Sequence, residues 1–121
     1  MGIYDVGPES VSVIAWTGPE GPAYPVFPMS SGLTSAGIRA KKTIFVGDVR
    51  NDPRYLTALG NTLSEMIVPV FDFAGQKVVG TIDVESELAN AFSVEQDAEI
   101  EEFAWLALPL WTSGLIPNDA D

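Results

Sequence analysis

Three carboxylates, Glu65, Asp83 and Glu85, are the side chains whose types and spacing best suit a binding site. Asp83 and Glu85 are two positions apart in a strand-forming run, so their side chains share one face of that strand. Glu65 begins the preceding strand-forming run, and a hairpin between the two runs brings the three carboxylates together. Converging carboxylates in a pocket suit a primary amine, or a guanidinium that binds through two hydrogen bonds. The structural alternative is that Glu65 caps nearby backbone amides and Glu85 caps the turn after its strand.

The composition excludes most catalytic chemistry. The 121 residues include no cysteine and no histidine, so thiolate nucleophiles, serine–histidine triads and histidine or cysteine metal sites are not available. Paired carboxylates can act as general acid and base, but no nucleophile or oxyanion motif accompanies these three. We therefore expect no enzyme activity, no metal and no cofactor.

A second polar cluster lies at positions 48–55. Asp52 and Pro53 have the pattern of a helix start, with the aspartate as the cap and the proline at the first helical position. Arg54 can pair with Asp48 or with Asp52, which explains the cluster structurally. In the functional interpretation, the helix at 54–59 and Tyr55 cover the carboxylate pocket, and Asp48 and Tyr55 join its ligand-binding residues.

The elements that position these groups follow from local patterns. Strand-forming runs separated by turn residues predict two hairpins, and the four prolines between 18 and 28 predict a loop. Ser93 with Gln96 forms a capping box at the start of a last helix, whose buried stripe is expected to include Ile100, Phe103, Ala104 and Ala107. Hairpin-linked strands with helices between them indicate an α+β fold with an antiparallel sheet covered by helices. The predicted strands are 3–6, 11–16, 43–46, 64–72 and 77–85, and the predicted helices are 32–42, 54–59 and 93–108. We expect a single domain over 1–121, with a tail from 110 to 121.

The charge balance limits the partners. Six basic residues against 17 acidic ones give a net charge of −11, which repels nucleic acid and anionic membrane surfaces. No apolar run approaches the ~20 residues of a membrane span. We therefore expect a cytoplasmic protein that binds neither nucleic acid nor membrane.

Three motifs in order resemble those of GAF domains. They are VGDVRNDPRY at 46–55, SEMIVPV at 64–70, and VGTIDVES at 79–86 followed by AFS at 91–93 and by Asp97. Together they extend over most of 32–105. The resemblance implies a central antiparallel sheet of five to six strands with helices packed on it and a ligand pocket beneath loops.

Within that family, the free methionine-(R)-sulfoxide reductases are the most similar branch. The resemblance places their amine-binding carboxylates on Glu65, Asp83 and Glu85. Their two cysteines fall on Ala58 and Thr34 in this chain. Without thiols, such a reduction is excluded unless another chain supplies them.

The resemblance also implies a long helix before the first strand, and this sequence starts directly with a strand-forming run. Apolar surface left uncovered there would mark an interface, so we expect a homodimer or a partner at that surface. The leading hypothesis is a non-catalytic sensory or regulatory domain that binds a small molecule and signals through dimerisation. One alternative is a structural dimerisation domain with a vestigial pocket. Another is a degenerate protein of the sulfoxide reductase type.

Overall fold

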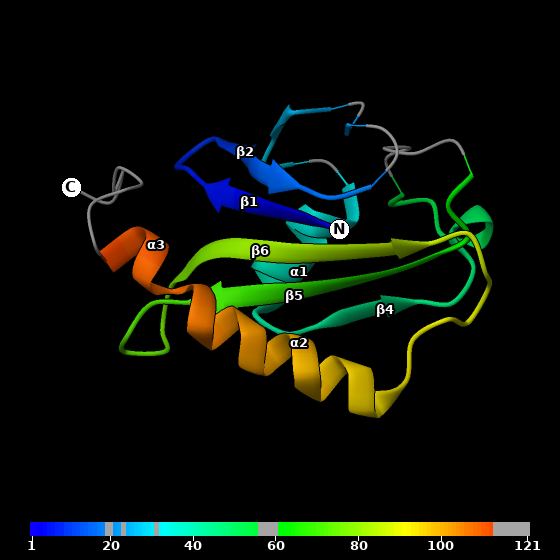
Figure 1. The fold of residues 1–121 in the computed structure, drawn as a ribbon. Helices are drawn as coiled ribbons and strands as arrows, with labels where there is room; N and C mark the ends of the chain where they lie inside the picture. Colours follow the sequence, from blue (N-terminus) through cyan, green and yellow to red (C-terminus); the bar gives the residue numbers. More distant parts are fainter. Residues whose placement is uncertain (19–20, 23, 31, 56–60, 113–121) are drawn as a thin grey trace.

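Six strands form one antiparallel sheet in the order β3-β2-β1-β6-β5-β4. The computed structural model describes residues 1–18, 21–22, 24–30, 32–55 and 61–112 (Figure 1). The predicted hairpins are present as β1–β2 and β5–β6, and the α+β class with an antiparallel sheet is confirmed. The strands are β1 (Gly2–Val6), β2 (Ser10–Trp16), β3 (Val26–Pro28), β4 (Ile44–Val46), β5 (Ser64–Phe71) and β6 (Val78–Ser86).

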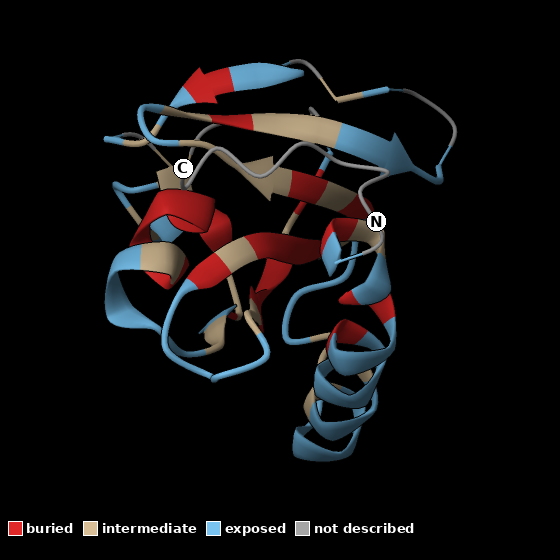
Figure 2. Ribbon diagram, turned by 90° about the vertical axis from the view of Figure 1, so that its left-hand side faces the viewer, coloured by how far each residue is buried: buried red, intermediate tan, exposed pale blue. Residues whose placement is uncertain are grey.

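The two longer helices, α1 (Gly32–Ala40) and α2 (Val94–Ala107), cover opposite faces of the sheet (Figure 1). Alternation along β5 explains this arrangement, because successive side chains of a strand point to opposite faces. Met66 and Val68 pack in the apolar layer under α2, whereas Ile67 packs against Leu33 of α1. Figure 2 shows that the outer face of α2 is exposed while the strands beneath are buried.

The start of α2 confirms the predicted capping box. The Ser93 side chain accepts from the Gln96 amide, and the Gln96 side chain accepts from the Ser93 amide. These bonds satisfy two N–H groups that a helix start otherwise leaves unpaired. The predicted buried stripe holds for Ala104 and Ala107, but Phe103 is exposed. Phe103 was therefore placed wrongly.

A short helix, α3 (Pro109–Thr112), follows α2 and closes one end of the sheet. Its Trp111 is 8% exposed and belongs to the apolar layer under α2. The indole Nε1 donates to Oδ1 of Asp5 on β1 at 2.9 Å, and the ring lies against Gly80 of β6. Residues 110–112, expected in the tail, are thus helical and packed; 113–121 lie outside the described residues.

Two further expectations were wrong. The proline-rich segment contains strand β3, in which Phe27 pairs with Val11 and is buried. Residues 52–55 form a turn rather than a helix start, because the Asp52 side chain accepts the Arg54 amide and the Arg54 guanidinium. The remainder of the expected helix, 56–59, lies outside the described residues. A one-turn 3₁₀ helix, η1 (Val49–Asn51), comes before that turn.

No helix in the described ranges is both long enough and apolar enough to cross a bilayer.

Candidate functional site

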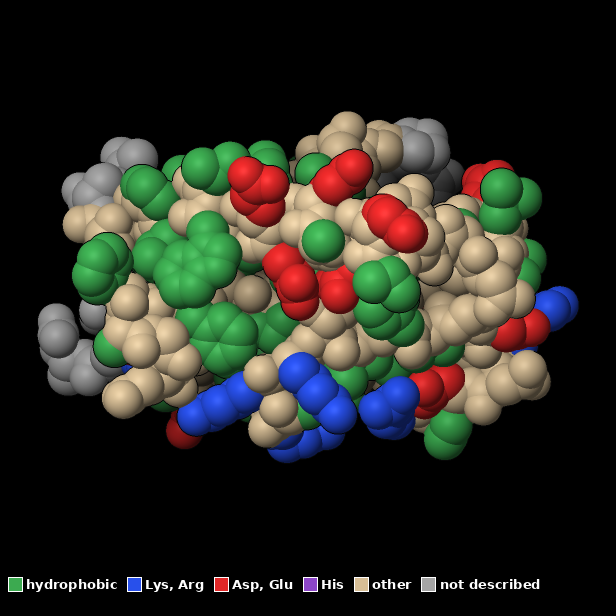
Figure 3. All heavy atoms as spheres, turned by 90° about the horizontal axis from the view of Figure 1, so that it is seen from below, with side chains coloured by type: hydrophobic (Ala, Val, Ile, Leu, Met, Phe, Trp, Pro, Cys, Tyr) green, Lys and Arg blue, Asp and Glu red, His purple; other side chains and the backbone are tan. Residues whose placement is uncertain are grey.

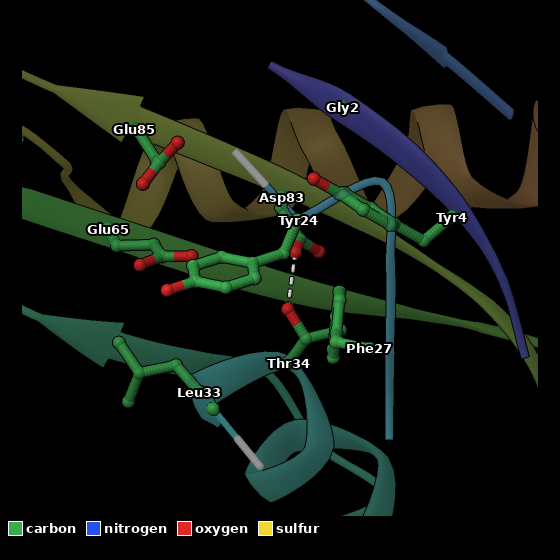
Figure 4. Close-up of a pocket in the computed structure, with 10 residues that line it drawn as sticks. Gly2, Tyr4, Tyr24, Phe27, Leu33, Thr34, Glu65, Asp83 and Glu85 are labelled. Carbon is green, nitrogen blue, oxygen red and sulfur yellow. Dashed lines mark hydrogen bonds between the residues drawn. The ribbon is translucent and has the colours of Figure 1, made fainter. Parts of the chain in front are cut away.

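The register of the sheet brings the three predicted carboxylates together. Glu65 of β5 lies directly opposite Glu85 of β6, and Asp83 lies two residues earlier on β6. On its other side, Asp83 pairs with Gly2 of β1. Residues paired across strands, and residues two apart on one strand, share a face. All three carboxylates therefore lie on the face that α1 covers (Figure 4).

A small cavity of about 40 Å³ lies among these carboxylates and the start of α1. A volume of this size holds on the order of one to three water molecules. Tyr24, whose side chain is 43% exposed, lines the cavity and separates it from solvent. The complete lining consists of Gly2, Tyr4, Tyr24, Phe27, Gly32, Leu33, Thr34, Glu65, Asp83 and Glu85.

Burial dominates the electrostatics of the site. Glu65 and Asp83 are each only 7% exposed. Burial raises the pKa of Asp83 to about 7 and the pKa of Glu65 well above its usual range, and repulsion from the neighbouring carboxylates adds to both. Burial also raises the pKa of Glu85 and of the Tyr4 hydroxyl. A carboxyl group that loses water without gaining a counter-charge resists ionisation.

No lysine or arginine of the described residues forms an ion pair with these carboxylates. The two ion pairs found there are Asp48–Arg50 at 2.7 Å and Asp52–Arg54 at 2.6 Å. The N-terminal ammonium favours the ionised forms of Asp83 and Glu85, but it donates its hydrogen bond to the Thr17 carbonyl at 3.0 Å. The buried cluster is therefore left without a directly paired cation.

The hydrogen bonds around the cluster leave acceptors open. Thr34 donates from Oγ1 to Oδ2 of Asp83 at 2.5 Å, while Oδ1 of Asp83 is buried without a partner among the described residues. Tyr55 donates from its hydroxyl to Oε1 of Glu85 at 3.4 Å. In the described ranges, no backbone amide donates to the Glu65 carboxylate, so the expected capping role of Glu65 is not seen there. The open acceptors suit a ligand that carries several N–H donors.

These acidic groups are not arranged to bind a metal. Within the part of the chain that the structure describes, no group of three or more acidic side chains has a suitable arrangement.

Comparison with known proteins gives solved structures of the same architecture. No protein-family model and no curated protein matches the chain. A type II free methionine-R-sulfoxide reductase from Thermoplasma acidophilum superposes with a TM-score of 0.83 at 29% identity, covering 90% of this chain and 75% of that one. A free methionine-R-sulfoxide reductase from Neisseria meningitidis, solved with its substrate, gives 0.82 at 22% identity, covering 94% and 67%. A putative GAF sensor protein from Burkholderia vietnamiensis gives 0.75 at 22% identity, covering 85% and 63%.

This chain has the GAF fold. The assignment agrees with the motif resemblance, and the absence of cysteine from the sequence separates this GAF domain from thiol-dependent reduction. Thr34, at the position that the resemblance gives to one cysteine, lines the cavity and contacts Asp83. Ala58, at the position of the other cysteine, lies outside the described residues.

The GAF fold places the predicted site residues unequally. Glu65, Asp83 and Glu85 converge, and Tyr55 reaches the cluster through Glu85. Asp48 does not line the cavity: its carboxylate caps η1 and pairs with Arg50.

Sequence reasoning did not assign Tyr4 or Thr34 to the site. Tyr4 pairs with Thr81 of β6 and so shares a face with Asp83. The pairing of β1 with β6 has no local sequence signal, which is why Tyr4 was not found. For Thr34, the alignment with a reductase cysteine was the available signal.

Proposed function

We propose that this GAF domain is a non-catalytic sensory module that binds a small molecule carrying a primary ammonium group. The unpartnered Oδ1 of Asp83, buried in a cluster without a paired cation, is the observation that carries the proposal. An ammonium group supplies three donors and a positive charge. Binding therefore relieves both the unsatisfied acceptor and the repulsion among Glu65, Asp83 and Glu85.

The aromatic lining supports the same ligand class. Tyr4 and Phe27 pack edge to face, with ring centroids 5.8 Å apart, and both line the cavity with Tyr24. Aromatic faces attract cations, most strongly where water is excluded. A ligand larger than a few atoms requires Tyr24 to move, because the cavity volume is only about 40 Å³.

The test is a thermal-shift measurement at pH 8 with methylamine, methionine sulfoxide and N-acetyl-methionine sulfoxide. The first two carry an ammonium group and the third does not. A ligand at 100 times its Kd stabilises the folded state by about 2.7 kcal/mol, which raises Tm by several degrees. We expect at least one ammonium compound to raise Tm, and the N-acetyl compound to leave it unchanged.

Two variants connect the shift to the cavity. Glu65→Gln removes a buried charge of the cluster, and Glu102→Gln makes the same chemical change at an exposed site on α2. The ammonium-dependent shift should be lost in Glu65→Gln and kept in Glu102→Gln. Equal shifts in both variants, or none in the unmodified protein, would reject the proposal.

A structural dimerisation domain with a vestigial pocket is the second candidate. The small cavity favours it, as do the exposed apolar side chains Phe103, Trp105 and Leu106 on α2. Figure 3, viewed from the side of α2, shows hydrophobic side chains at that surface. Light scattering of the protein separates the candidates: a stable dimer without any ammonium-dependent shift favours the structural role.

A further inference from the structure

Thr34 lies in the first turn of α1 and is only 6% exposed. Its hydroxyl donates to Oδ2 of Asp83 at 2.5 Å, a contact between residues 49 positions apart in the sequence. We infer that Thr34 is the positioning residue of this cavity: by occupying Oδ2, it presents Oδ1 of Asp83 to the ammonium group. The inference rests on the proposed function, since it concerns the ligand of that site.

The geometry makes the two oxygens of Asp83 unequal. A carboxylate turns readily about its last side-chain bond, because rotation about this type of bond meets no sharp minima. A donor at one oxygen selects one orientation. In the structure the hydroxyl of Thr34 holds Oδ2, and Oδ1 is left buried without a partner. The cavity lining includes Thr34, Asp83 and Glu65, so the free oxygen belongs to the site (Figure 4).

The same bond favours the ionised carboxylate. Burial raises the pKa of Asp83 to about 7, and the hydrogen bond from Thr34 acts in the opposite direction. Replacing the hydroxyl by a methyl group removes a donor from a buried carboxylate, so its pKa rises further. A cation then competes with a proton over a wider pH range.

A purely structural role is the competing explanation, because the bond also joins α1 to β6. A structural bond lowers the stability of the protein when it is removed. It does not change how binding of a cation depends on pH. The pH profile of binding therefore separates positioning from stabilisation.

The experiment uses methylammonium chloride, a probe that stays charged throughout the range and is small enough for the cavity. Its binding to the full chain is followed by NMR titration from pH 6 to pH 9. Thr34→Val removes the hydroxyl and keeps the shape of the side chain, whereas Thr34→Ser keeps a hydroxyl. Ser35→Ala is the matched control, since the neighbouring Ser35 hydroxyl is also buried but lacks a hydrogen-bond partner in the described structure.

We expect Thr34→Val to bind methylammonium about tenfold more weakly at pH 7, the effect of losing one hydrogen bond to a charged group. The loss should shrink by pH 9, because a high pH ionises Asp83 without help from Thr34. Thr34→Ser should recover binding, and Ser35→Ala should match the unmodified protein. The Asp83 carboxyl carbon signal, recorded without ligand, should titrate at higher pH in Thr34→Val.

The outcomes distinguish this inference from the proposed function. If Thr34→Val binds as the unmodified protein does at every pH, the positioning role is wrong and the ammonium site stands. If the unmodified protein does not bind methylammonium, both are wrong. Should Thr34→Val fail to fold, Thr34→Ala, which lacks the hydroxyl and adds no bulk, takes its place with the same expected loss.

Discussion

At the scale of single residues, the buried carboxylates lower the stability of this fold at neutral pH. The pKa of Asp83 rises from 3.8 in water to about 7 in the folded protein, and Glu65 shifts in the same direction from 4.5. The folded state therefore holds protons that the unfolded chain has already released. Stability contributed by these groups is fully present at acidic pH and is lost as the pH rises through about 7.

We predict that Glu65→Gln makes the protein more stable at pH 8 and has little effect at pH 5. Glutamine has the shape of protonated glutamic acid but never becomes charged, so the cost of burying a carboxylate disappears. The gain at pH 8 should be on the order of 1 kcal/mol or more, the equivalent of at least one pKa unit. Urea unfolding at both pH values measures it.

Glu102→Gln serves as the control, because surface substitutions usually change stability by less than about 0.5 kcal/mol. A Glu65→Gln variant that is less stable than the unmodified protein at pH 8 would show that the Glu65 carboxylate is paired in the folded state.

At the scale of elements, the capping box at Ser93 makes a separate prediction. Ser93→Ala removes the acceptor for the Gln96 amide, so it should lower the free energy of unfolding by about 1 kcal/mol. Ser93→Asp keeps an acceptor at the helix start and should retain most of the stability. Thermal unfolding followed by circular dichroism compares the two, and equal losses in both variants would contradict the capping role.

Elements with strong local signals were predictable, and those fixed by distant contacts were not. The β5–β6 hairpin and the start of α2 have the patterning and capping residues that define them, and the three carboxylates follow from that hairpin. Strand β3 is only three residues long and includes Pro28; it is held by pairing with β2 and by the packing of Phe27 on Tyr4.

The turn at 52–55 failed for a different reason. The sequence pattern of a helix cap is the same as that of an aspartate turn, in which the side chain accepts the amide two residues on. Arg54 decides between them here, because its guanidinium contacts the same Asp52 carboxylate that accepts its own amide. Local rules do not weigh that extra contact.

At the scale of the whole molecule, Gly80 allows β1, β6 and α3 to meet. A Cβ atom at this position would lie 2.3 Å from the Trp111 ring and 2.7 Å from the Tyr4 carbonyl oxygen. Both distances are too short, and the second involves backbone that cannot move alone. Gly80→Ala should therefore lower the free energy of unfolding by about 1–3 kcal/mol, as overpacking does.

Urea unfolding of Gly80→Ala and of Gly80→Ala/Trp111→Phe tests this account. The smaller phenyl ring relieves one clash but leaves the one with the Tyr4 carbonyl, so the loss in the double variant should be less than the sum of the single losses. An unchanged unfolding midpoint in Gly80→Ala would contradict the close approach.

The alternation along β5 also protects the protein against misfolding. A slip of one residue against β6 would turn every side chain of β5 to the other face of the sheet. Glu65 would then enter the apolar layer under α2, and Met66 and Val68 would take its place among the remaining carboxylates. A charge enclosed by hydrocarbon costs far more than one beside polar neighbours. The acidic cluster, which weakens the native state, therefore penalises the misaligned hairpin more heavily and helps to make the correct pairing unique.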